Sequence, residues 1–207
     1  MTTILHVDSS PLGTFSVTRQ LTASIVEALV KADPAATVVT RDVAANPPAH
    51  LDGELLPVLK LGVVDGLSER QREELALTNV LLDEFLAADV VVVGAPMYNF
   101  SVPTQLKAWI DRLAQAGRTF RYAEKGPEGL AGGKRVIVAS GRGGVYSTNP
   151  ALAGLDHQEA YLRSVFGFFG ITDVTFIRAE GVSMGQEAKD KALAAATKEI
   201  ESLLAAA

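Results

Sequence analysis

A short segment near the N-terminus carries an unusual density of hydroxyl groups. The stretch SSPLGTFSVTRQL, which directly follows Asp8, contains Ser9, Ser10, Thr14, Ser16 and Thr18. It runs into a predicted helix, whose free N–H groups and dipole favour an anion. Serine and threonine also start helices in ordinary capped loops, but this number exceeds what capping requires. The segment contains neither a Walker lysine nor a G-x-G-x-x-G motif. We therefore expect a phosphate held by hydroxyls and amides.

A second candidate is the tetrapeptide Met97-Tyr98-Asn99-Phe100, which follows an unbroken apolar run. Its apolar side chains could simply cover the end of a sheet. Asn99 argues against that interpretation, because a buried amide costs about 1–3 kcal/mol unless it is paired. A planar heterocycle with donors and acceptors along one edge would supply the pairing, and the thioether and aromatic groups would cover its face.

A third candidate is the segment SGRGGVYS, Ser140–Ser147, with glycines at positions 141, 143 and 144. These glycines allow close approach of a ligand to the backbone and expose amide donors. Such donors could stabilise negative charge on a ring oxygen. A flexible turn is the simpler interpretation of this segment alone. Together, however, the three segments predict a phosphate pocket, a platform for a flat ring and donors along its edge, which are the parts of FMN.

The apolar pattern predicts the elements that position these segments. Short runs rich in β-branched residues alternate with longer helical periods, and the run before Met97 is apolar on both faces, as a central parallel strand should be. The expected strands are Thr3–Val7, Thr37–Arg41, Asp89–Ala95, Lys134–Ser140 and Asp173–Ala179.

Helices are expected after each strand. Ser16 is a suitable N-cap for the first, and Ser68 with Gln71 forms a capping-box pattern for the second. Pro103 lies near the start of the third, where its missing N–H costs nothing. Two more are expected at about 157–169 and after Gly185. Residues 43–67 show no clean period and predict a long excursion with a short helix.

This alternation predicts an α/β fold with a doubly wound, five-stranded parallel sheet and helices on both faces. No segment resembles a linker, so we expect one domain over residues 1–207. In such folds ligands bind beyond the carboxyl ends of the strands, near the point where strand order reverses. The three candidate segments all follow strands.

Composition restricts the class of partner. The net charge of −5 argues against nucleic-acid binding, which needs a basic face. The chain has no cysteine, which excludes disulfides and thiolate chemistry, and its three histidines lack metal-ligand spacing, so no metal is expected. Neither a signal peptide nor a membrane span is predicted. We therefore expect a cytoplasmic protein that handles small molecules.

The motif GVSMG, Gly181–Gly185, matches the nucleophile elbow of α/β hydrolases. In that class the histidine follows the serine along the chain, whereas all three histidines here precede Ser183. We interpret Ser183 as a helix cap instead.

The chain resembles the FMN-dependent NADH:quinone oxidoreductases and bacterial azoreductases, which have a flavodoxin-like fold. The resemblance covers essentially the whole chain. Its most specific part is APMYNFSVPTQLKAWIDRLAQAGRTFRY from Ala95 to Tyr122, followed by GPEGL, GRGG and GITDV, with RDVAANP and LDGEL near residues 41–56.

The resemblance also implies the cofactor-binding residues. The phosphate loop corresponds to Ser10 and to the Ser16-Val17-Thr18 turn, and the ring platform to Met97, Tyr98, Asn99 and Phe100. The second loop corresponds to Gly141-Arg142-Gly143-Gly144, where Gly141 replaces a serine usual in the family. Phe120 and Tyr122 are expected around the substrate pocket, although ordinary packing would equally account for both.

The implied activity is a ping-pong cycle in which NADH or NADPH reduces FMN, which then reduces a quinone or an azo compound by two electrons. The resemblance further implies a homodimer with its active sites at the subunit interface. The alternative is an electron carrier that binds FMN without a small-molecule substrate of its own. The excursion at 43–67 and the loop at 117–133 favour the enzyme, because they could form walls around a substrate.

Overall fold

The computed structural model describes residues 1–205 and contains one five-stranded sheet in which every neighbouring pair is parallel. The strand order is β2-β1-β3-β6-β7. Each strand lies within two residues of its predicted bounds. The strands are β1 (Thr3–Asp8), β2 (Thr37–Asp42), β3 (Val90–Pro96), β6 (Arg135–Arg142) and β7 (Asp173–Glu180). The predicted doubly wound fold is confirmed.

The strand order places a reversal between β1 and β3. The chain passes from β1 outward to β2 and returns to place β3 on the other side of β1. The connections that leave β1 and β3 therefore diverge over opposite faces of the sheet and open a crevice at their carboxyl ends. The segments after Asp8, Pro96 and Arg142 meet at this edge.

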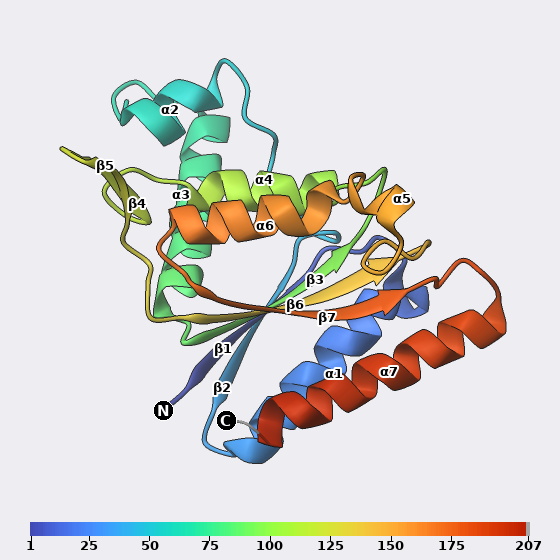
Figure 1. The fold of residues 1–207 in the computed structure, drawn as a ribbon. Coiled ribbons are helices and arrows are strands. Elements are labelled where there is room, and N and C mark those ends of the chain that lie inside the picture. Colours follow the sequence, from blue (N-terminus) through green and yellow to red (C-terminus); the bar gives the residue numbers. More distant parts are fainter. Residues whose placement is uncertain (206–207) are drawn as a thin grey trace.

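Helices cover both faces of the sheet (Figure 1). One face carries α1 (Val17–Ala32) and α7 (Gln186–Ala205), and the other carries α3 (Glu69–Ala87), α4 (Thr104–Leu113) and α6 (His157–Phe168). Three short helices lie in the connections: η1 (Gly13–Phe15), α2 (Leu55–Leu61) and α5 (Pro150–Ala153).

The central strand β3 is buried on both faces. Val91 and Val93 pack into the core beneath α3, α4 and α6, whereas Val92 packs beneath α1 and α7. This alternation follows the two-residue period of a strand. On the first face the ring of Phe85 meets Trp109 edge to face at a centroid distance of 6.0 Å. The two layers hold β3 rigidly and fix where its carboxyl end emerges.

The predicted helix starts are also confirmed. Ser16 caps α1 and accepts a hydrogen bond from the N–H of Arg19 at 3.2 Å. Ser68 and Gln71 form both bonds of a capping box at the start of α3. Each cap satisfies a donor that the helix itself leaves free.

The excursion after β2 contains the expected short helix, α2, and is tied to the helical layer by two cations, the buried Arg112 and the half-buried Lys60. Arg112 of α4 donates to the carbonyl of Ala49 at 2.6 Å and pairs with Glu74 at 2.7 Å. Lys60 of α2 donates to the carbonyls of Asp111 and Ala114 at 2.6 and 2.5 Å. These contacts hold the excursion against α4.

The segment 117–133 differs from the expected loop. It forms an antiparallel hairpin, β4 (Phe120–Ala123) and β5 (Gly126–Gly129), which is a separate two-stranded sheet. The backbone at Gly129 lies so close to Gly170 that a Cβ at Gly129 would stand 2.1 Å from the Gly170 nitrogen. This contact fastens the hairpin beside the start of β7. The sequence did not identify the hairpin because β5 reads Gly-Pro-Glu-Gly, which has no alternation of apolar and polar residues and is typical of a turn.

Candidate functional site

A cavity of about 140 Å³ opens at the carboxyl end of the sheet, where the three candidate segments converge. The connection after β1 and the start of α1 form one side, and the ends of β3 and β6 form the other. The lining residues are Ser10, Leu12, Ser16, Val17, Thr18, Pro96, Met97, Tyr98, Gly141, Gly143, Val182 and Ser183.

The α1 side of this cavity presents neutral donors. Ser10, Ser16 and Thr18 are at least 98% buried, and the Oγ of Ser16 lies 3.0 Å from the Oγ1 of Thr18. The N–H groups of Val17 and Thr18 are in the first turn of α1 and have no carbonyl partner within the helix. Hydroxyls, free amides and the positive end of a 16-residue helix are the groups that could hold an anion here.

Arg19 lies behind this loop and does not line the cavity. Its Nε and Nη2 donate to the carbonyl of Ser10 at 3.0 and 2.9 Å, and its Nη1 pairs with Asp42 at 2.8 Å. The hydrogen bond to Asp42 raises the pKa of Arg19. Burial raises the pKa of Asp42, but hydrogen bonds from Arg19 and from backbone N–H groups outweigh burial and hold that pKa below its ordinary value. The guanidinium thus fixes the loop from outside.

The segment after β3 forms a tight turn. Tyr98 and Ser101 exchange two backbone hydrogen bonds of 2.9 and 3.1 Å, which leaves Asn99 and Phe100 at the turn with φ angles of 46° and 72°. Left-handed conformations are unfavourable for an aromatic residue and are concentrated at functional sites. The carbonyl of Phe100 accepts a hydrogen bond from the N–H of His157 at 3.1 Å, which ties the turn to α6.

Asn99 differs from the expectation based on the sequence. We expected its amide to be buried, but the residue is exposed at the tip of the turn and does not line the cavity. The hydrophobic run ends at Pro96, so the turn projects beyond the edge of the sheet. Tyr98 and Phe100 are also partly exposed, at 37% and 43%. Met97 and Tyr98 line the cavity.

The glycine segment after β6 lies against this turn. The N–H of Met97 donates to the carbonyl of Gly141 at 2.8 Å, which continues the β3–β6 pairing past the end of β3. Gly141 and Gly143 line the cavity, and Gly144 lies outside the lining. The backbone of β6 therefore forms one wall of the cavity.

Arg142 points away from the cavity into a buried ionic cluster. Its side chain is 1% exposed and pairs with Glu159 at 2.6 Å, with Asp156 at 3.0 Å and with Glu180 at 3.1 Å. Its Nε donates to the hydroxyl of Ser140 at 3.0 Å. The structure thus places only the backbone of Arg142 near the site, which is the part of the residue from which the sequence led us to expect a contact, and its side chain supports the strand end.

Ser183 lines the cavity, which the sequence did not lead us to predict. We expected it to cap the last helix, but α7 begins at Gln186 and Ser183 lies in the preceding turn. Its N–H donates to the carbonyl of Gly143 at 3.2 Å. The position of this serine between a strand and a helix was the only available signal, and it also fitted a cap.

Phe120 and Tyr122 belong to β4, which lies beside the opposite end of the sheet from the cavity (Figure 1). Phe120 is 8% exposed and packs on Phe168 at a centroid distance of 4.5 Å, whereas Tyr122 is 79% exposed. Figure 1 shows β4 and β5 beside the end of the sheet remote from α5. The structure therefore does not bring these two residues to the cavity of their own chain.

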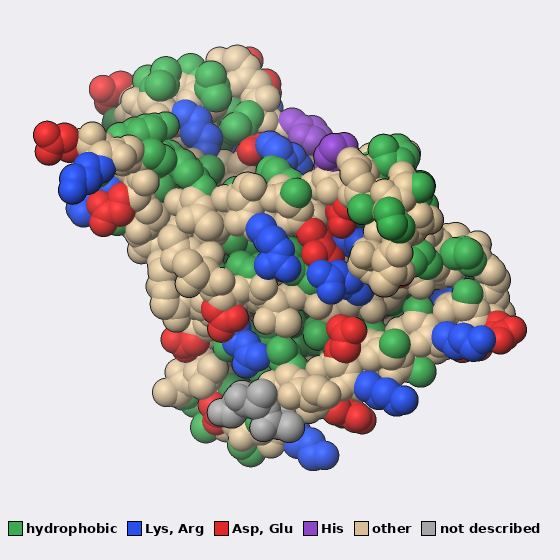
Figure 2. Space-filling model, viewed as in Figure 1, with side chains coloured by type: hydrophobic (Ala, Val, Ile, Leu, Met, Phe, Trp, Pro, Cys, Tyr) green, Lys and Arg blue, Asp and Glu red, His purple; other side chains and the backbone are tan. Residues whose placement is uncertain are grey.

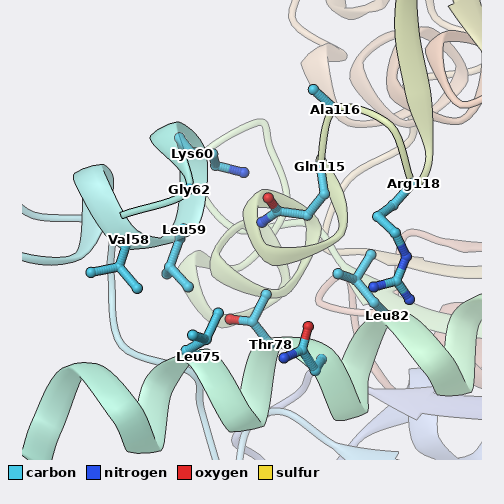
Figure 3. A pocket seen from close by; sticks show the side chains of 11 residues that line it. Val58, Leu59, Lys60, Gly62, Leu75, Thr78, Leu82, Gln115, Ala116 and Arg118 are labelled. Atoms are coloured by element: carbon cyan, nitrogen blue, oxygen red, sulfur yellow. The ribbon is translucent and has the colours of Figure 1, made fainter. Parts of the chain in front are cut away.

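A larger cavity of about 330 Å³ lies between α2, α3 and the segment after α4 (Figure 3). Lys60, Thr78, Gln115 and Arg118 supply much of its polar lining. The carbonyls of Asp111 and Ala114 already accept from Lys60 at the C-terminus of α4. This cavity is at the opposite end of α4 from the turn after β3, so it is separate from the site above.

Two properties of residues 1–205 bear on the class of site. They contain no cluster of three or more His, Asp or Glu side chains that could hold a metal ion. No helix among them is long and apolar enough to cross a membrane.

The donor set of the small cavity fits the phosphate end of FMN. Orphan N–H groups and buried hydroxyls match phosphate oxygens, and a Cβ added at Gly141 would stand only 2.8 Å from the Cγ2 of Thr18. The backbone of β6 at Gly141 therefore packs against α1 with no room for a side chain between them. At about 140 Å³ the cavity is smaller than the ~300–1,000 Å³ of typical ligand pockets. A flat ring would extend from it over Met97 and the turn.

Comparison with known proteins agrees with this fold and site. The family profile described as having a flavodoxin-like fold matches residues 2–204. An FMN-dependent NADH:quinone oxidoreductase of Azospirillum brasilense is 69% identical over 200 residues, which cover 97% of this chain and 96% of that protein. One of Polaromonas naphthalenivorans is 59% identical over 201 residues, with coverages of 97% and 92%.

Solved structures give the same result. An azoreductase from Bacillus anthracis superposes with a TM-score of 0.88 at 30% identity and covers 99% of each chain. An FMN-dependent NADH-azoreductase from the same species, solved in complex with FMN, has a TM-score of 0.89 at 25% identity, with coverages of 99% and 98%. The protein is thus a flavodoxin-like α/β protein with a cavity at its switch point. More narrowly, it belongs to the family of FMN-dependent NADH:quinone oxidoreductases and azoreductases.

Proposed function

We propose that this protein is an FMN-dependent NAD(P)H:quinone oxidoreductase that also reduces azo compounds. The observation that carries the proposal is the cavity at the switch point, where the N-terminus of α1 meets the close-packed ends of β3 and β6. Relatives of that name, one of which is 69% identical to this chain, support the proposal. The cytoplasmic location expected from the sequence remains a prediction.

The phosphate is held by neutral donors. Ser10, Ser16 and Thr18 supply hydroxyls, and Val17 and Thr18 supply N–H groups aligned with the dipole of α1. Arg19 would not contact the phosphate, because its guanidinium already serves the Ser10 carbonyl and Asp42. Its role is to keep the loop in place.

The ring is positioned by the segments after β3 and β6. FMN, when bound, supplies the capacity to accept a hydride at its N5 atom and to pass two electrons to an acceptor. Met97 and Tyr98 line one side, and Gly141 and Gly143 allow the backbone to approach the other. We assign Asn99 to the pyrimidine edge of the ring, a contact made at the exposed tip of the turn. Phe100 and the backbone of Arg142 and Gly144 complete the surroundings.

We also propose that the enzyme is a homodimer with a composite site. The cavity is too small to enclose a flavin, and Tyr98 and Phe100 remain partly exposed beside it. Exposed apolar side chains also gather at the other end of the molecule, on and after α2 and on the hairpin, and Figure 2 shows hydrophobic side chains over the α2 region. A second copy that brings its own hairpin to this cavity would cover both surfaces. In that arrangement Tyr122 of each chain would face the partner's site.

The dimer is tested by light scattering on the purified protein and by the variant Tyr122→Ala. We expect a mass of two chains and a lower kcat/KM for quinones in the variant, with unchanged affinity for FMN. A monomer that turns over at full rate would contradict the composite site.

Turnover tests the activity itself. FMN-loaded protein should oxidise NADH or NADPH with benzoquinone and with an azo dye, without a partner protein, and initial rates should give the parallel double-reciprocal lines of a ping-pong cycle. The rival function is an electron carrier that holds FMN and has no substrate. Failure of both nicotinamides to reduce the bound flavin would favour the carrier.

A further inference from the structure

Gly141 occupies a position whose backbone does not require glycine. It lies in β6, one residue from the end of the strand, and pairs with Pro96 of β3. Its φ angle lies outside the left-handed region that favours glycine, in contrast to residues such as Gly170 and Gly181. Another cause must account for the absence of a side chain.

The neighbouring helix supplies that cause. A Cβ at Gly141 would stand 2.8 Å from the Cγ2 methyl of Thr18, and the next atoms, the Thr18 nitrogen and the Cγ1 of Val17, would be at 3.9 Å. The methyl group of Thr18 is therefore the single obstacle. By comparison, a Cβ at Gly154 or Gly167 would meet nothing within 4 Å.

The side chain of Thr18 cannot rotate away from position 141 without moving its hydroxyl group as well. The residue is 2% exposed in the first turn of α1, and its hydroxyl lies 3.0 Å from the hydroxyl of Ser16. Methyl and hydroxyl share one Cβ, and a β-branched side chain has few χ1 states in a helix. A rotation that moves the methyl away from position 141 also moves the hydroxyl away from Ser16 and out of the phosphate pocket.

We propose that Thr18 and Gly141 are a matched steric pair that sets the hydroxyl of residue 18 for the phosphate and so determines preference for FMN over riboflavin. A side chain at position 141 is compatible with tight FMN binding only when residue 18 lacks its methyl group. This inference rests on the proposed FMN site. It predicts a coupling between two positions that are 123 residues apart in the chain.

The test is a double-mutant cycle on the apoprotein with Gly141→Ala, Thr18→Ser and the double variant. Dissociation constants for FMN and for riboflavin are measured by quenching of flavin fluorescence. Gly141→Ala should weaken FMN binding by about tenfold or more, as overpacking of a close-packed site does, and should affect riboflavin less. Thr18→Ser keeps the hydroxyl and removes only the methyl group, so it is the reference for the double variant. The double variant should bind FMN about as tightly as Thr18→Ser does, and more tightly than Gly141→Ala.

Thermal unfolding of the flavin-free variants gives a readout that does not depend on the cofactor. Gly141→Ala should lower the Tm, and addition of Thr18→Ser should restore most of it. Two matched controls separate the pair from general effects. Gly167→Ala adds a methyl group where a Cβ meets nothing, and Thr22→Ser removes the next buried threonine methyl of α1, whose Cγ2 faces Gly94. The combination Thr22→Ser with Gly141→Ala should show no rescue.

The outcomes distinguish this inference from the proposed function. If wild-type apoprotein fails to bind FMN, the proposed function falls, and the coupling in Tm still decides the steric pair. If the wild type binds FMN but the Thr18→Ser/Gly141→Ala variant binds it no more tightly than Gly141→Ala, the added methyl blocks the ligand directly and the inference is wrong.

Discussion

The guanidinium of Arg142 lies 2.6 Å from the carboxylate of Glu159, and 1% of the Arg142 side chain is exposed. The two residues join the carboxyl end of β6 to the first turn of α6. Arg178 of β7 donates to the same carboxylate at 2.6 and 2.8 Å. The adjacent Gln158 links the strand ends directly, since it donates to the carbonyl of Ala95 at 2.9 Å and accepts from Ser140 at 2.7 Å. The walls of the cavity therefore stand on a buried polar network.

Removal of the Arg142 charge should be strongly destabilising. Arg142→Met leaves Asp156 and Glu180 without their ion-pair partner and leaves Glu159 paired mainly with the more exposed Arg178. Breaking a buried pair on one side costs about 3–5 kcal/mol. Urea unfolding of the apoprotein measures this loss. Lys191→Met is the matched control, because Lys191 pairs with Glu187 at 2.6 Å on an exposed turn of α7. That control should cost less than about 1 kcal/mol. Equal losses in both variants would contradict the structural role of Arg142.

Loss of the hydroxyls at the start of α1 should reduce discrimination between FMN and riboflavin. Ser16→Ala with Thr18→Ala removes two buried hydroxyls that line the cavity, so FMN affinity should fall by at least about tenfold, while riboflavin affinity changes little. Fluorescence titration of both flavins measures the ratio.

Ser68→Ala is the control for the capping role of Ser16. Ser68 caps α3 in the same way, with a hydrogen bond from the N–H of Gln71 at 3.2 Å, but it does not line the cavity. Both changes should lower stability by about 0.5–2 kcal/mol, and only the α1 variant should lose preference for FMN. A retained strong preference in that variant would place the phosphate elsewhere.

The fold could be predicted because local and global signals agree. The run at β3 is apolar on both faces, which only a strand covered by two helical layers requires. Ser16 and Ser68 mark helix starts through side-chain bonds to nearby N–H groups, so these features need no tertiary information. The phosphate loop could be predicted for the same reason, because its hydroxyl groups and the helix N-terminus lie in one continuous segment of the sequence.

The remaining features depend on contacts between distant segments. Asn99 follows a buried strand in sequence, yet the turn bonds of Tyr98 and Ser101 project it into solvent. The burial of Arg142 comes from carboxylates that are 14 to 38 residues away. Gly141 resembles any loop glycine until Thr18 is seen against it. No periodicity encodes such contacts.

The backbone at Phe100 should be strained. Its φ of 72° costs about 1–2 kcal/mol for a residue with a Cβ and nothing for glycine. Both Phe100→Ala and Phe100→Gly remove the ring, so their difference isolates the backbone. We expect the glycine variant to be more stable than the alanine variant by about 1 kcal/mol in urea unfolding of the apoprotein. The opposite order, as in an ordinary loop, would show that the turn is relaxed.

Lys60 should make the free energy of unfolding depend on pH in the alkaline range. Burial lowers the pKa of its amine from 10.5 to about 8. The neutral amine can still donate to the carbonyls of Asp111 and Ala114, so deprotonation leaves both contacts intact. Well below pH 8 the amine is charged in both states, and folding bears the full cost of its desolvation. Between about pH 8 and 10.5 the unfolded chain binds more protons than the folded one, so this group makes unfolding less favourable as the pH rises. The urea midpoint of the wild type relative to Lys60→Met should therefore increase from pH 7.5 to pH 10, with the gain absent in Lys60→Arg, whose charge persists. A difference that stays constant across this range would contradict the lowered pKa.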